Sequence, residues 1–243
     1  MSMKKNFWRI FTVLLIHVAF VLNATAQDIP AEQLEFTSFP YPMNQKWRAS
    51  LGFNLTTLAQ DVTEELHLRV PCGDFHVLRK LSEHTHLDGR IQFQVFQNQV
   101  SLGPRWAFPL SHRTSISFGD DIAWWFGFIN REGFKTTGNG FQNYPNISLG
   151  YRFNKGVLLT LREEAIMNLS VSAKTGTTPV TADYRLFGGS AFTATLEQPF
   201  YGKRSLSLGF RFVYTDFFWQ TWALFPTFDR NIFYPQLLIA YIF

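Results

Sequence analysis

The sequence ends with NIFYPQLLIAYIF, residues 231–243, in which large apolar side chains recur at every second position. Successive side chains of an extended chain point to opposite faces, so this spacing predicts a strand with two different faces. One face carries Phe233, Leu237, Ile239, Tyr241 and Phe243, and the other carries Tyr234, Gln236, Leu238, Ala240 and Ile242. The two faces differ, because the first ends in the aromatic residues Tyr241 and Phe243 and the second includes Gln236 and Ala240.

The same alternation recurs through most of the chain. Leu206, Leu208 and Phe210, for example, alternate with Ser207 and Gly209. The pattern predicts eight strands: Trp47–Ala59, Arg90–Leu110, Thr114–Ile129, Phe141–Phe153, Val157–Val171, Tyr184–Gln198, Arg204–Phe217 and Asn231–Phe243. Short links (111–113, 154–156, 200–203) alternate with longer ones (130–140, 172–183, 219–230). Antiparallel strands with tight turns on one rim and loops on the other give such a series.

Composition narrows the class of protein. Charged residues make up 16% of the chain and aromatic residues 17%, whereas an ordinary soluble domain has about 25% charged residues. Mean hydropathy is only −0.04, and beyond residue 26 no run approaches the roughly 18 apolar residues of a membrane helix. A sheet with one lipid-facing and one polar face explains this combination, because the two faces average out in hydropathy.

The first 26 residues have the features of a secretory signal peptide. Lys4 and Lys5 precede an apolar run, Ile10–Leu22, and Ala24-Thr25-Ala26 offers a small-x-small cleavage site. Cleavage lowers Lys plus Arg from 22 to 19 against 18 acidic residues, so the mature chain is nearly neutral and nucleic acid is not an expected partner. We therefore predict a signal peptide (1–26), a periplasmic N-terminal segment (27–46) and one domain (47–243). Cys72 is the single cysteine, which excludes an intramolecular disulfide.

Alternation alone does not distinguish a membrane barrel from a soluble β-sandwich or a lipocalin-like barrel. Three features favour the membrane barrel: arginines and small residues on the polar face, aromatic residues at the ends of the apolar face, and a chain that stops on its last strand. Backbone groups in hydrocarbon must be paired, so a strand protein can span a bilayer only as a closed sheet.

The terminal strand resembles that of bacterial outer-membrane β-barrel proteins, in which alternate hydrophobic residues and a final aromatic residue are recognised by the barrel-insertion machinery. In this chain the matching residues are Leu237, Ile239, Tyr241 and Phe243. The resemblance covers Trp47 to Phe243 as a pattern. It implies a signal peptide-exported protein of the bacterial outer membrane, surrounded by lipid, with both termini and the tight turns in the periplasm and the long loops outside.

The number of strands is either eight or ten. Residues 60–89 alternate weakly, and Asp88-Gly89 is a hairpin signal. Ten strands need this segment as an extra hairpin, but Arg79 and Glu83 then share a face with Val77 and Leu81, which is costly against lipid. We prefer an all-β, closed antiparallel up-and-down barrel of eight strands, with residues 60–89 as an extracellular excursion and a β-bulge at 97–99.

Asp120 and Glu163 fall on the lipid-facing side of their strands. A charge there is expensive, so we predict that a bulge, at Gly119 for example, rotates them inward.

The polar face predicts a network of charges in the lumen. Its members are Arg48, Arg105, Asp121, Arg152, Arg162, Glu164, Glu197 and Arg211. The network is either a structural substitute for an apolar core or the lining of an anion-tuned pore. We favour the first, because side chains fill the interior of a narrow barrel; ten strands would favour the pore.

Three other groups of residues are candidate sites. The last long loop brings Phe218, Trp219, Trp222 and Phe225 to the outer rim, as an aromatic belt or as a contact patch for an extracellular protein or glycan. His84 and His86 lack a third ligand at a fixed spacing, so no metal site is predicted. Ser111, His112 and Ser115 have no carboxylate nearby, so no catalytic residues are assigned.

The sequence therefore predicts a non-enzymatic outer-membrane barrel with a structural or interaction role, a side-chain-filled lumen and no cofactor. A porin-like small-solute channel is the first alternative, and a lipid-modifying barrel enzyme is the second.

Overall fold

The computed structural model describes residues 35–59, 69–131, 134–153, 156–180, 183–201, 204–222 and 227–243. The predicted signal peptide lies outside these ranges. Within them, no helix has the length and apolar character needed to cross a membrane.

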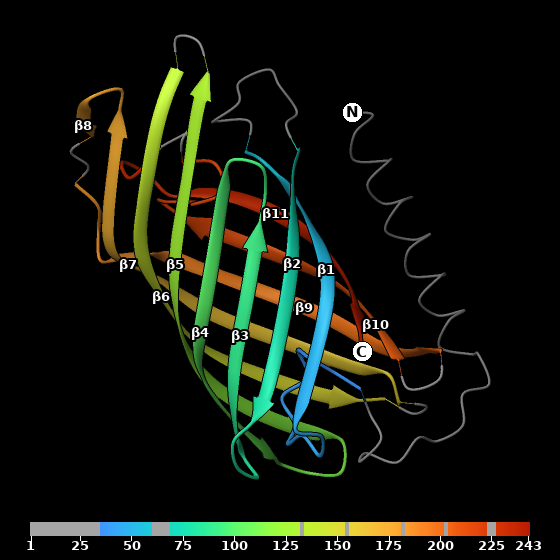
Figure 1. The fold of residues 1–243 in the computed structure, drawn as a ribbon. Coiled ribbons are helices and arrows are strands. Elements are labelled where there is room, and N and C mark those ends of the chain that lie inside the picture. Colours follow the sequence, from blue (N-terminus) through green and yellow to red (C-terminus); the bar gives the residue numbers. More distant parts are fainter. Residues whose placement is uncertain are drawn as a thin grey trace, which may run out of the picture.

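Ten strands form a closed antiparallel barrel, and an eleventh short strand extends from it (Figure 1). Their bounds are β1 (Trp47–Thr57), β2 (Arg69–Lys80), β3 (Thr85–Phe93), β4 (Gln97–Pro109), β5 (Thr114–Arg131), β6 (Phe134–Arg152), β7 (Leu158–Thr175), β8 (Thr178–Val180), β9 (Phe187–Tyr201), β10 (Arg204–Thr215) and β11 (Ile232–Ile242). Each barrel strand pairs with its neighbour in the chain, and β8 forms a small hairpin on β7. Pairing of β1 with β11 closes the sheet, with Phe53 opposite Ile239.

The two faces of the barrel differ as the alternation predicts. Outward positions carry exposed apolar side chains, such as Leu51 (54% exposed) and Ile122 (55% exposed). Inward positions carry buried polar groups, among them Thr56, Gln142 and Glu197. An apolar exterior around a polar interior is the inverse of a soluble protein, and it suits a hydrocarbon surrounding.

The preferred count of eight strands was wrong, and the ten-strand alternative is the one observed. The predicted strand Arg90–Leu110 is two strands, β3 and β4, joined by residues 94–96. The change of parity that we attributed to a bulge at 97–99 is this turn. Asp88-Gly89 lies within β3 rather than at a hairpin turn.

The argument against ten strands failed because the two charged residues are not in the lipid zone. Arg79 is near the end of β2 and stacks over the Trp47 ring, and Glu83 belongs to the turn 81–84. Residues 69–89 are therefore barrel wall, whereas 60–68 lie outside the described residues.

The predicted inward rotation of Asp120 and Glu163 was also wrong. Both side chains are exposed on the outer face. The register between β5 and β6 runs without a shift past Gly119, whose inner side is occupied by the Asn146 side chain. The register shifts of this part of the wall lie at Phe141/Gln142 and Ile166/Met167 instead.

One rim of the barrel, called here the short-turn rim, is where β2 ends and β3 starts, β4 ends and β5 starts, β6 ends and β7 starts, and β9 ends and β10 starts; β1 also starts there. The longer connections leave β1, β7 and β10 at the opposite rim. The predicted long loop 130–140 is absent, because β5 and β6 continue as a hairpin until Arg131 faces Phe134.

The close approach of β4 and β5 makes Gly103 a test of this register. A Cβ atom at Gly103 would lie 2.1 Å from the carbonyl oxygen of Asp120, whereas one at Gly89 has no neighbour nearer than Leu102 Cδ1, at 3.4 Å. We expect Gly103→Ala to lower the free energy of unfolding by about 1–3 kcal/mol and Gly89→Ala to change it little. Urea unfolding in detergent micelles measures both, and equal midpoints would contradict the register.

Candidate functional site

The segment before β1 fills the lumen at the short-turn rim (Figure 1). Phe36, Phe39 and Met43 are buried there against Leu78 of β2 and Leu158 of β7. Residues 35–46, the described part of the predicted N-terminal segment, lie in the lumen and are called the inner plug.

Two barrel side chains hold the inner plug by its main chain. Glu197 accepts hydrogen bonds from the backbone N–H groups of Thr37 (2.8 Å), Ser38 (2.9 Å) and Phe39 (2.8 Å). Arg105 donates to the carbonyl oxygens of the same three residues, at 2.6–2.8 Å. Hydrogen bonds to charged groups are about twice as strong as neutral ones, so this clamp is the main polar attachment of the plug.

Other contacts add to the clamp. Arg48 pairs with Glu35 at 3.0 Å and lies over the Phe36 ring. The backbone N–H of Met43 donates to Nε2 of His86, which is 1% exposed.

A network of charges occupies the middle of the lumen, and its first half comes from β2, β3 and β4. Asp74 pairs with Arg90, with 2.7 Å between Arg90 Nε and Asp74 Oδ1. Nε2 of His76 lies 2.6 Å from Oδ1 of Asp88, whose other oxygen faces Arg105 at 3.6 Å. Each carboxylate therefore has a basic partner.

The second half of the network comes from β5, β7 and β10. Arg162 pairs with Asp121 at 2.9 Å and with Glu164 at 3.1 Å. Glu164 also pairs with Arg211, so one carboxylate lies between two guanidinium groups. Such a set is stable only while all members are present, because a lone buried charge is strongly unfavourable.

The loop after β10 fills the other end of the lumen. Phe217, Trp219 and Trp222 are buried there against Trp125 of β5. The Gln220 side chain accepts hydrogen bonds from Thr56 Oγ1 (3.3 Å) and Gln236 Nε2 (3.2 Å). We call residues 216–222 the outer plug.

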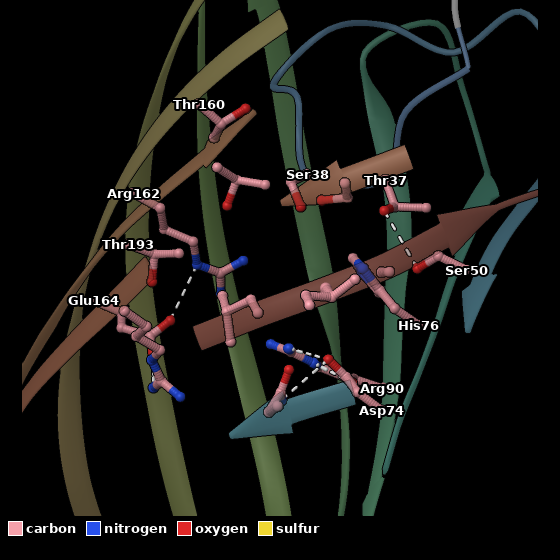
Figure 2. A pocket seen from close by; sticks show the side chains of 17 residues that line it. Thr37, Ser38, Ser50, Asp74, His76, Arg90, Thr160, Arg162, Glu164 and Thr193 are labelled. Atoms are coloured by element: carbon pink, nitrogen blue, oxygen red, sulfur yellow. Dashed lines mark hydrogen bonds and ion pairs between the residues drawn. The ribbon is translucent and has the colours of Figure 1, made fainter. Parts of the chain in front are cut away.

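Two small polar cavities remain between the plugs, of about 70 and 40 Å³. Figure 2 shows the larger, into which Thr37 and Ser38 of the inner plug project from one side and Arg162 and Glu164 from another. Its remaining walls come from β1, β2, β3, β9, β10 and β11, including Asp74 and Arg90. Space of this size and polarity suits a few water molecules.

The structure places the predicted lumen residues in three groups. Asp121, Arg162, Glu164 and Arg211 meet in the central network, and Arg48, Arg105 and Glu197 hold the inner plug. Arg152 lies apart, beside a shallow pocket at the short-turn rim.

Asp74, His76 and Asp88 are lumen residues that the sequence prediction left out. The omission follows from treating residues 60–89 as an excursion. The available signal was Asp74, His76 and Leu78 at alternate positions, which fits an inward strand face.

The proposed aromatic contact patch is not an exposed surface. Trp219 and Trp222 are each 4% exposed, and Phe218 packs on Tyr234. The loop folds into the barrel because its aromatic rings are buried against Trp125 rather than left in water. Phe225 lies outside the described residues.

The remaining candidates are not brought together as a site. His84 stacks on Phe108, whereas His86 is buried under the inner plug. The described residues contain no cluster of three or more groups able to hold a metal. Ser111 bonds Thr114 at 2.7 Å, and Cys72 is buried near Trp125.

Adjacent residues of β7 provide a matched test of the network. Glu164→Gln leaves two buried arginines short of a carboxylate and should lower the free energy of unfolding by about 3–5 kcal/mol. Glu163→Gln removes a charge from the lipid-facing side and should leave stability unchanged or higher. Urea midpoints in micelles compare the two, and an equal loss for both variants would contradict the assigned faces.

Comparison with known proteins shows the fold. No family model and no curated protein sequence matches the chain. Among solved structures, an outer-membrane channel from Pseudomonas putida F1 has a TM-score of 0.53 at 10% identity, covering 89% of this chain and 99% of the other. The translocator domain of the autotransporter NalP from Neisseria meningitidis has a TM-score of 0.48 at 10% identity, covering 82% and 88%. With a closed ten-stranded wall and an apolar exterior, this chain has the fold of a bacterial outer-membrane β-barrel.

Proposed function

We propose that this protein is an outer-membrane barrel with a structural or interaction role, whose lumen is closed in its resting state. The observation that supports the proposal is that the charged and polar side chains of the lumen bond to one another and to the two plugs. Glu197 and Arg105 are used by the inner plug, and Trp219 and Trp222 close the other end.

The energetics of the lumen favour a closed state. A continuous water path along the axis requires displacement of at least one plug and separation of paired charges such as Arg162 and Glu164. Each pair lies in a low-dielectric interior, where breaking it leaves a charge without its partner. The network therefore acts as a polar core that fixes the shape of the wall.

A small-solute channel is the second candidate. It is supported by the two polar cavities, which already provide hydroxyl and charged groups between the plugs. The solved structure with a TM-score of 0.53 is itself named as a channel. In this role the inner plug is a gate, and release of Thr37 and Ser38 connects the larger cavity to the short-turn rim.

Conductance in planar bilayers separates the two roles. We expect the wild-type barrel to give no steady openings. The double variant Glu197→Ala/Arg105→Ala removes the main-chain clamp: continued silence supports the closed structural barrel, whereas openings support the gated channel. Arg113→Ala, in the turn 110–113, is the matched control, and a heat-dependent shift on gels confirms folding of each sample. Steady wild-type openings would overturn the closed resting state.

We further propose that the outward face of β11 is the signal read during membrane insertion. Leu237, Ile239, Tyr241 and Phe243 all lie on that face, and Phe243 is 53% exposed. Phe243→Ala should reduce the heat-modifiable fraction recovered in outer membranes severalfold, whereas Phe233→Ala, on the same face at the other end, should not. Equal recovery of both variants would remove the special role of the last residue.

A further inference from the structure

An aromatic and basic surface lies on the outside of the barrel where its first and last strands meet. At the short-turn rim, the Arg79 guanidinium lies 5.0 Å from the centre of the Trp47 ring. On the other side of the closing seam, the Arg204 guanidinium lies 5.8 Å from the centre of the Tyr241 ring. Two cation–π pairs thus flank the seam.

The four strands that carry these pairs are consecutive in the wall, in the order β2, β1, β11, β10. Arg79 is opposite Trp47 in the ladder, and Ser205, next to Arg204, is opposite Ile242. The two arginines are therefore about three strand spacings apart across the wall, or roughly 14 Å, and are offset by two residues along it, because Arg204 is level with Val77. We call this outward surface, formed by Trp47, Arg79, Arg204 and Tyr241, the seam surface.

The charge of the seam surface is positive. This charge comes from Arg79 and Arg204. Lys80, the next residue of β2, lies on the opposite face of the strand, across the ladder from the buried His86. In the turn that follows, the Glu83 carboxylate lies 3.9 Å from Nε2 of His84. Among the described residues, no carboxylate lies within ion-pair distance of Arg79 or Arg204.

Elsewhere on this rim, exposed outward residues include Phe108, Phe153 and Phe200, which suit an interfacial aromatic belt. The exposed Arg113 belongs to the turn 110–113, away from the seam. A general aromatic girdle explains the aromatic residues, but it does not explain two arginines that lie over aromatic rings on either side of the seam.

We propose that the seam surface binds the phosphate headgroup of an anionic phospholipid, such as phosphatidylglycerol, in the periplasmic leaflet. Aromatic rings of a barrel girdle lie at headgroup depth. A guanidinium stacked on such a ring keeps its N–H edge free, and that edge matches the oxygen pair of a phosphate. The assignment of leaflet rests on the expected orientation, with the short-turn rim in the periplasm.

The binding is selective for charge because the surface offers two guanidinium groups with no carboxylate of the described residues within ion-pair distance. Attraction of a basic side chain to an anionic headgroup is worth about a fivefold change in binding per residue. Loss of both arginines should therefore reduce a preference for anionic over zwitterionic lipid by about tenfold or more. Added salt should weaken the preference, because the site is exposed.

Native mass spectrometry of the mature barrel, released from micelles with equal phosphatidylglycerol and phosphatidylcholine, tests the proposal. The wild type should retain phosphatidylglycerol preferentially, and Arg79→Gln/Arg204→Gln should lose that preference. Arg113→Gln is the matched control, because it removes an arginine from the same rim away from the seam. Samples are compared only when their heat-dependent gel shift shows a folded barrel.

Equal retention of the two lipids by the wild type would overturn the proposal, and so would an equal loss in Arg113→Gln. Lipid A is added in a third arm. Preferential retention of lipid A that depends on Arg79 and Arg204 would assign the seam surface to the outer leaflet and contradict the stated ligand. None of these results depends on whether the lumen conducts.

Discussion

Closure of the sheet by β1 and β11 is the constraint on which the rest of the molecule depends. In hydrocarbon no water is available to pair with an open edge, so the first and last strands must meet in register, as they do from Ser50 opposite Ile242 to Thr56 opposite Gln236. In the closed sheet, successive side chains of every strand face the lipid and the lumen in turn. Closure also places the polar face of each strand in a confined interior, where side chains must find partners of their own.

The interior satisfies this requirement in layers. Backbone groups of the inner plug meet Glu197 and Arg105, charged side chains pair in the middle, and aromatic rings pack around Trp125 at the far end. Ion pairs in the middle of the lumen take the place of an apolar core, and packed apolar side chains lie only at its two ends. Stability is consequently vulnerable to removal of one charge but tolerant of changes on the outer wall.

The sequence was sufficient to predict the class of fold, because a period of two is a strong local signal. It was insufficient for the strand count, because Arg79 and Glu83 were judged by the face they share and not by their height along the wall. Their position at a rim depends on the register of β2 with β1, which is long-range information. The same limitation applies to Trp219 and Trp222: an aromatic loop has the same composition whether it faces outward or folds back into the lumen.

The main-chain clamp has a consequence for how related sequences can diverge. Glu197 and Arg105 make six hydrogen bonds with amide and carbonyl groups of residues 37–39, and Glu197 also accepts one from Oγ1 of Thr37 at 3.3 Å. Substitution of Ser38 by any residue except proline, which lacks the N–H group, leaves all six main-chain bonds possible. Selection should therefore act on the two distant wall positions and only weakly on residue 38, whereas the neighbouring Phe39 is also constrained by its buried ring.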